Sequence, residues 1–177
     1  MVASSKPSPP DQMPRPRRTR RTGRRDPLAI AMLKKDHRAV EAWFDEYEQL
    51  EADADKLALF NQIALALKVH CQIEEEIFYP EDRGEVEDDM LDEAYVEHAG
   101  AKNLIAEIEQ MEPSEAFYDA KVKVLGEYIK HHVREEEQPG GIFAQAKKGD
   151  TELDAMGERL NARKRELLAR LDAKGLA

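Results

Sequence analysis

The chain has 177 residues, of which 41% are hydrophobic and 36% charged, so its length predicts one domain with one core beneath a charged surface. It has no run of about 18 apolar residues, and we expect no transmembrane helix. The one cysteine, Cys71, excludes an internal disulfide and a multi-cysteine zinc site, and a cytoplasmic location fits this composition.

The net charge of −10 is unevenly distributed along the chain. Residues 1–26 carry eight basic and two acidic side chains, a net charge of +6, which leaves −16 for residues 27–177. We expect the acidic part to repel duplex DNA. Residues 1–26 are also rich in Pro, Ser and Arg without hydrophobic periodicity, which predicts a disordered tail. This tail either only solubilises the protein or weakly binds nucleic acid or another acidic partner. Because no apolar segment follows its arginine pairs, we expect no export signal.

The rest of the chain reads as five helices. Asp26 and Pro27 suit a helix start, Pro80 suits the end of the second helix, and Ser114 suits the cap of the fourth. The predicted helices cover residues 27–51, 55–79, 89–111, 114–138 and about 150–173, with an acidic loop at 81–89 and a break at Pro139-Gly140-Gly141. Long helices with short connections predict an all-α fold, an antiparallel up-down four-helix bundle over residues 27–145. Residues 146–177 then supply an extra C-terminal amphipathic helix.

Each of the first four helices is predicted to place one histidine on its apolar stripe. At about 100° per residue, His132 lies on the stripe of the fourth helix, whereas His131 falls about 180° from the stripe centre. We therefore reject His131 and Glu135 as site residues in favour of His132 and Glu136. The six candidates on core faces are His37, His70, Glu74, His98, His132 and Glu136.

The two glutamates on core faces point to a bound cation. Glu is almost never fully buried unless it is paired or binds a metal. No Lys or Arg shares these stripes near the two glutamates, so a metal ion would supply the missing positive charge. Imidazole nitrogen and carboxylate oxygen together suit iron, zinc or manganese.

The candidate ligands form a repeat. His37 precedes the pair His70 and Glu74 by 33 residues, and His98 precedes the pair His132 and Glu136 by 34 residues. The strings HCQIEEEIF (70–78) and HHVREEEQPGGIF (131–143) are alike, but aligning their EEE runs would pair His70 with His131. The strings thus leave the register open by one residue, and helical phase decides it. Two metals, each on two histidines with both carboxylates bridging, would satisfy this repeat; one metal with six ligands is the more crowded alternative.

The order His, HxxxE, His, HxxxE resembles the hemerythrin family in its HHE cation-binding branch, over about residues 27–145. The supporting strings are LKKDHRAV (33–40), HCQIEEEIFYP (70–80), VEHAGAKNLI (96–105) and YIKHHVREEE (128–137). The resemblance implies a di-iron centre on the six candidates that reacts with dioxygen, peroxide or nitric oxide, or an iron-handling role. Oxygen-carrying members have a second histidine where this chain has Lys102, and HxxxxD where it has HxxxE. These departures argue against simple reversible oxygen carriage.

Other readings stay open at this stage. Ferritin-like di-iron bundles use ExxH, which is absent, because the residues three places before the core histidines are Lys34, Leu67, Tyr95 and Ile129. From another class, the chain is a helical interaction or regulatory module with a structural or vestigial metal and a basic tail that binds acidic partners. The last helix carries a stripe that either covers the bundle or forms a dimer seam: Leu153, Met156, Leu160, Leu167 and Leu171. The oligomeric state is left open.

Several residues near the candidates receive structural interpretations. We expect Cys71 to be a half-buried structural thiol and Lys102 to extend its amine to solvent. The tyrosines either line the bundle or rim the site, with packing as the default: Tyr47, Tyr79, Tyr95 and Tyr128. The glutamates beside the candidates are assigned mostly to a solvated face: Glu75, Glu76, Glu135 and Glu137.

Overall fold

The computed structural model describes residues 25–172, apart from the side chains of residues 171 and 172. The predicted tail therefore lies outside the described residues, except for Arg25 and Asp26. In chain order the helices are α1 (Leu28–Tyr47), α2 (Asp53–Ile73), the π-helical turn η1 (Glu74–Phe78), α3 (Tyr79–Asp82), α4 (Asp88–Ile108), α5 (Tyr118–Glu137), α6 (Ile142–Ala146) and α7 (Leu153–Asp172). None of the described helices is long and apolar enough to cross a membrane.

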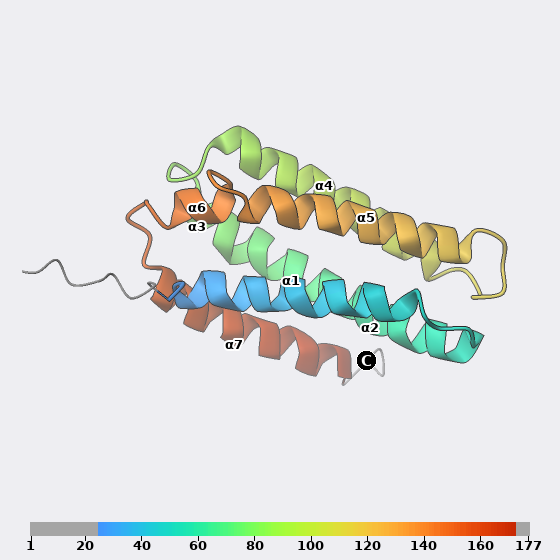
Figure 1. The fold of residues 1–177 in the computed structure, drawn as a ribbon. Helices are drawn as coiled ribbons and strands as arrows, with labels where there is room; N and C mark the ends of the chain where they lie inside the picture. Colours follow the sequence, from blue (N-terminus) through green and yellow to red (C-terminus); the bar gives the residue numbers. More distant parts are fainter. Residues whose placement is uncertain (1–24, 173–177) are drawn as a thin grey trace, which may run out of the picture.

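The four long helices α1, α2, α4 and α5 form the bundle. Helix α1 packs against α2 and α5, and α4 packs against α5 and α2. Figure 1 shows α4 and α5 lying together on one side of α1, with α7 on the other side. The short connections at residues 48–52 and 109–117 make each pair of helices antiparallel. The predicted all-α four-helix bundle with an extra C-terminal helix is confirmed.

Helix α1 begins differently from the prediction. Its N-cap is Pro27, not Asp26. The backbone N–H of Leu28 donates to Asp154 Oδ1 of α7 at 2.7 Å, while Asp26 forms ion pairs with Lys34 and Lys147. A free N–H at the start of a helix needs an acceptor, and here a distant segment supplies it.

Two further helix boundaries were predicted wrongly. Pro80 does not end the second helix, because the helical segment continues without a break from α2 through η1 into α3, which contains Pro80 and ends at Asp82. Ser114 does not cap the fourth helix. Helix α5 begins at Tyr118 after Phe117, which has a left-handed φ of 73°. The buried Tyr118 side chain anchors that start.

The buried side chains form two apolar clusters with a polar layer between them. Along α1, Leu33 belongs to one cluster and Val40 to the other, and His37 lies between them. Along α4, Ala94 and Ala101 flank the layer in the same way. The bundle therefore has an apolar core that is interrupted once, near its middle.

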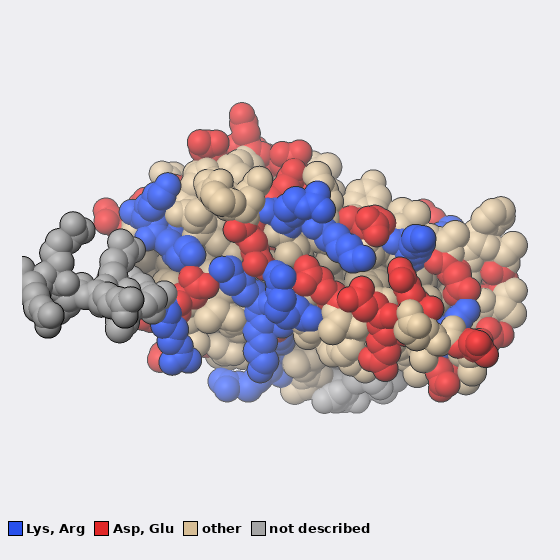
Figure 2. Space-filling view, viewed as in Figure 1, with Lys and Arg blue, Asp and Glu red and all other residues tan. Residues whose placement is uncertain are grey.

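Helix α7 covers the α1 and α2 side of the bundle. Its buried stripe consists of Leu153, Met156, Leu160 and Leu167, whereas the side chain of Leu171 lies outside the described residues. A Cβ on Gly157 would come within 2.6 Å of the Ala29 nitrogen, so glycine permits the close approach of α7 to α1. Ion pairs to Asp36, Glu81 and Glu76 add to the contact; Figure 2 shows basic and acidic side chains interspersed on this face. This stripe therefore covers the bundle.

Candidate metal centre

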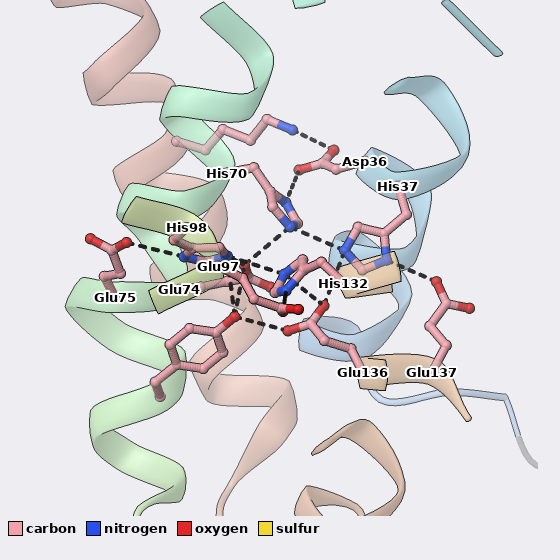
Figure 3. Close-up of polar contacts among 12 residues, drawn as sticks. Asp36, His37, His70, Glu74, Glu75, Glu97, His98, His132, Glu136 and Glu137 are labelled. Atoms are coloured by element: carbon pink, nitrogen blue, oxygen red, sulfur yellow. Dashed lines mark hydrogen bonds and ion pairs between the residues drawn. The ribbon is translucent and has the colours of Figure 1, made fainter. Parts of the chain in front are cut away.

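The six predicted site residues converge in the polar layer. Each is at most 5% exposed, and Figure 3 shows the four histidines turned toward one another with the two glutamates among them. Helix α1 supplies His37, α4 supplies His98, and α2 with η1 and α5 supply the two HxxxE pairs. Helical phase thus correctly predicted which residues point inward.

The imidazoles meet in two pairs through their Nε2 atoms. The distance from His37 Nε2 to His70 Nε2 is 3.1 Å, and that from His98 Nε2 to His132 Nε2 is also 3.1 Å. Each pair joins two helices that are neighbours in sequence. The four ring nitrogens therefore face inward within one layer.

The outward nitrogens face a ring of carboxylates. Because a carboxylate only accepts, the Nδ1 atoms of three histidines must donate: His37 to Glu137 at 2.8 Å, His98 to Glu75 at 3.1 Å and His132 to Glu97 at 2.8 Å. His70 Nδ1 lies 3.7 Å from Asp36 Oδ2, beyond hydrogen-bond distance. A carboxylate of each helical segment thus faces the histidine of the next helix around the bundle, in the cycle α1, α2 with η1, α4, α5 and back to α1, and three of these four carboxylates accept a hydrogen bond from it.

These orienting carboxylates were missed or misassigned from the sequence. Glu75 and Glu137 were assigned to a solvated face, but both contact buried imidazoles. Lys102 was expected to extend into solvent, but its amine donates to the Glu75 carboxylate. The sequence does carry a signal. An acidic residue stands directly before His37 and His98, and directly after Glu74 and Glu136. In a helix such a neighbour lies about 100° from the core face, toward the adjacent helix.

The arrangement of donors fits a cation. The neutral imidazoles of His98 and His132, whose Nδ1–H is donated outward, each keep a lone pair on Nε2, so two lone pairs face each other across 3.1 Å in that pair. Glu74 Oε1 and Glu136 Oε2 are buried without a hydrogen-bond partner among the described residues. Burying several hydrogen-bond acceptors side by side lowers the stability of the folded protein unless a positive charge lies between them. Outer carboxylates that fix the imidazole tautomer are also typical of metal-binding histidines.

Each glutamate reaches both histidine pairs. Glu74 Oε2 lies 3.1 Å from His70 Nε2 and 3.4 Å from His98 Nε2. Glu136 Oε2 lies 3.3 Å from His37 Nε2 and 3.8 Å from His132 Nε2. Each of the two carboxylates therefore lies between the His37–His70 pair and the His98–His132 pair.

Without metal, protons must neutralise the layer. Burial disfavours the charged form of His70, but Glu74 and Asp36 outweigh it and raise the His70 pKa to about 10. Burial likewise disfavours ionised Glu136, but His132 and His37 outweigh it and lower the Glu136 pKa to about 2. The layer thus favours negative carboxylates that face positive charge.

Tyr79 belongs to the centre, which sequence reasoning did not predict. Its hydroxyl, fully buried, contacts Glu136 Oε1 at 3.0 Å, His98 Nε2 at 3.3 Å and Glu74 Oε2 at 3.4 Å. In a regular α-helix Tyr79 would lie about 140° around from Glu74, away from the core. The π-helical turn η1 widens the helix there and returns Tyr79 to the face of Glu74.

The rejected pair His131 and Glu135 lies at the surface. The His131 side chain is 54% exposed, and its Nε2 is 3.2 Å from Glu135 and 3.4 Å from Glu97. Cys71 is a buried free thiol, in agreement with its structural interpretation.

Two cavities adjoin the centre. A cavity of about 10 Å³ lies against the four histidines, and its other walls include the apolar side chains Val40, Leu67, Ile129 and Val133. This volume is close to that of one small molecule such as water. A second pocket, of about 100 Å³, lies between α4 and α5 and reaches His132 and Glu136.

This fold and this site define a class: four-helix bundles with a buried histidine–carboxylate layer that can bind cations. Comparison of the chain with known proteins identifies the family. Residues 28–139 match the sequence profile of the hemerythrin HHE cation-binding domain, and the chain belongs to that family. A crystal structure of an HHE cation-binding domain-containing protein from Mycobacterium kansasii shares the fold, with a TM-score of 0.69 at 23% identity over 83% of this chain and 93% of that one.

A relative with a different printed name also matches. A protein of Nostoc sp. strain PCC 7120 named DNA nickase is 30% identical over 106 residues, which are 60% of this chain and 30% of the relative. This chain therefore spans less than a third of that relative's length.

Proposed function

We propose that the six residues bind two iron ions and that the protein reacts with dioxygen, peroxide or nitric oxide, or handles iron. The observation that carries this proposal is the position of the two glutamates between the two histidine pairs. Each pair offers two imidazoles, and Glu74 and Glu136 each reach one imidazole of either pair. Two metals that shared the two carboxylates would use every donor, whereas one metal would have to gather all six residues around itself.

Iron is the metal that this proposal assigns, with zinc or manganese as the alternatives for the same donors. When bound, iron would supply redox chemistry toward a small oxidant or nitric oxide. The chain's own residues hold the donors in place through the outer carboxylates. The cavity of about 10 Å³ beside the histidines is at the lower limit of the space that one water molecule needs, so a ligand there would have to be very small.

Tyr79 provides the proton donor of the centre in this proposal. Its hydroxyl donates to Glu136 Oε1, and burial, together with the negative charges of Glu136 and Glu74, raises the pKa of this hydroxyl above its usual range. The phenol therefore stays protonated and holds the Glu136 carboxylate in one orientation.

The test is an anaerobic iron titration followed by additions of oxygen, peroxide and nitric oxide. We expect two irons per chain by elemental analysis, and a visible charge-transfer band after an oxidant is added. The double variant Glu74→Gln and Glu136→Gln should lose iron, whereas Glu127→Gln, an exposed change on α5, should keep both. One iron per chain in excess iron would overturn the di-iron assignment, and no change on adding any oxidant or nitric oxide would overturn the reactivity.

A second candidate function rests on the charge of the first 26 residues and on the name of the Nostoc relative. Residues 1–26 carry a net charge of +6, which suits a polyanion, and most of them lie outside the described residues. Under this proposal the chain binds duplex DNA through the tail. Binding should weaken steeply with salt and vanish on deletion of residues 1–25; unchanged binding after deletion would overturn it. Incubation of the full chain with a supercoiled plasmid tests the hypothesis that the protein nicks DNA.

We expect the protein to act in the cytoplasm, where Cys71 stays reduced. Detection of the native protein in a fractionated cell tests this.

A further inference from the structure

The surface of the bundle carries a second set of cation donors directly outside the centre. Glu97 on α4 and His131 and Glu135 on α5 form the outer cluster, in which one donor atom from each residue lies within 4.8 Å of the other two. The Glu97 side chain is 14% exposed and that of Glu135 is 30% exposed, so the open side of the cluster faces solvent. The donors are one imidazole and two carboxylates, a set that suits Fe²⁺, Mn²⁺ or Zn²⁺.

The outer cluster stands at the mouth of the pocket between α4 and α5. Glu97 and Glu135 line this pocket, and so do His132 and Glu136 of the centre. Two residues of the outer cluster and two proposed ligands thus share one space of about 100 Å³. Since liquid water takes about 30 Å³ per molecule, a partly hydrated ion fits there.

The chemistry of the pocket favours a cation. Its described lining contains four carboxylates, those of Glu93, Glu97, Glu135 and Glu136, and no Lys or Arg. Glu136 is fully buried, and its Oε2 has no hydrogen-bond partner among the described residues. A buried carboxylate with one oxygen left without a hydrogen bond, at the inner wall of the pocket, would draw a cation inward from the solvated mouth.

Glu97 connects the outer cluster to the centre directly. Its Oε2 accepts from His132 Nδ1 at 2.8 Å, and its Oε1 lies 3.4 Å from His131 Nε2. A cation on the outer cluster would therefore sit one carboxylate away from a proposed metal ligand. By contrast, the α1 and α2 side of the bundle is covered by α7.

We propose that Glu97, His131 and Glu135 form a divalent-cation site through which metal is loaded into the centre. This inference rests on the proposed metal-binding function of the centre. An ion binds first at the outer cluster, passes through the pocket and reaches His132 and Glu136. No electron transfer is part of this step.

The first measurement is outer-site binding. Mn²⁺ is titrated into iron-loaded protein, and free Mn²⁺ is followed by its electron paramagnetic resonance signal. Wild type should bind one Mn²⁺ per chain beyond the iron. His131→Ala and Glu135→Gln should weaken that binding by about tenfold or more. Glu127→Gln, which removes the same charge from an exposed position of α5, should match wild type.

The second measurement is the rate of iron uptake by metal-free protein, followed anaerobically by withdrawal of Fe²⁺ from a coloured chelator. His131→Ala and Glu135→Gln should load about tenfold more slowly and still reach the wild-type iron content, because neither residue belongs to the centre. Glu97 is left unchanged, since its loss would disturb His132.

The outcomes separate the two proposals. Wild-type protein that takes up no iron would overturn the proposed centre. Normal final iron content with equal loading rates in all four proteins would overturn the loading site alone, whether or not Mn²⁺ binding is lost. Slower loading in both variants, but not in Glu127→Gln, together with weaker Mn²⁺ binding, supports the loading site.

Discussion

The two halves of the bundle carry the same ligand pattern but differ in what surrounds it. The first half, α1 and α2, is covered by α7, and its histidine His70 lies 3.7 Å from its outer carboxylate. In the second half, α4 and α5, both histidines have outer carboxylates within 3.1 Å, and a pocket leads from the surface to Glu136. The repeat therefore accounts for the proposed metal donors, whereas α7, which lies outside the repeat, packs on the first half alone.

The largest expected effect separates His132 from its neighbour. His132→Ala removes an imidazole from the second pair, and iron affinity should fall by more than the roughly 100-fold that losing an outer partner can cost. His131→Ala should keep the centre's equilibrium iron content, because His131 lies outside the layer. Elemental analysis after dialysis against a chelator measures both. The reverse result would place Glu135 in the centre and give the second half a different helical phase.

The packing of α7 on the first half can be weakened with the substitution Leu160→Ala. Leu160 is fully buried between α7 and the bundle, and the change should lower the free energy of unfolding by about 2 to 5 kcal/mol. Hydrogen exchange should quicken mainly in α1, α2 and α7. Arg165→Ala, on the exposed side of α7, is the control and should change little. Equal quickening in α4 and α5 would show that α7 stabilises the bundle as a whole.

Asp82 tests the segment that joins the two halves. It is fully buried in α3, neither of its carboxylate oxygens has a hydrogen-bond partner among the described residues, and burial raises its pKa from 3.8 to about 6. Because the folded state holds this proton more tightly than the unfolded state, stability should fall as pH rises from about 4 through 6. Asp82→Asn should raise the free energy of unfolding by roughly 1 to 3 kcal/mol at pH 7.5 and by little at pH 4. Denaturant melts at both pH values measure this, and an equal effect at both would contradict it.

The smallest expected effect concerns the contact between the halves through Tyr79. Tyr79→Phe removes the hydroxyl that donates from α3 to Glu136 of α5 and should cost about 1 kcal/mol in the metal-free protein. Tyr128→Phe, half exposed on α5, serves as the control. Urea denaturation of both variants gives the difference. A Tyr79→Phe protein as stable as wild type would mean that the hydroxyl is not a needed donor.

The sequence by itself determined the four long helices and the inward direction of the six proposed ligands. Those predictions depend on local periodicity, because about 100° per residue fixes which side chains share a helix face. The same reasoning failed for Tyr79, since a π-helical turn changes the phase. It failed for Ser114 and Asp26 because helix starts there depend on a buried Tyr118 and on Asp154 of a distant helix.

Only the tertiary structure decided the relations between helices. The sequence places an acidic residue beside four of the candidates, but it does not say which histidine each carboxylate meets, because Asp36, Glu75, Glu97 and Glu137 each face a histidine on another helix. The meeting of His131 with Glu97 likewise depends on how α4 packs on α5. Periodicity gives the direction of a side chain from its own helix axis. Which partner it meets depends on how the helices pack against one another, and that is set by the whole core.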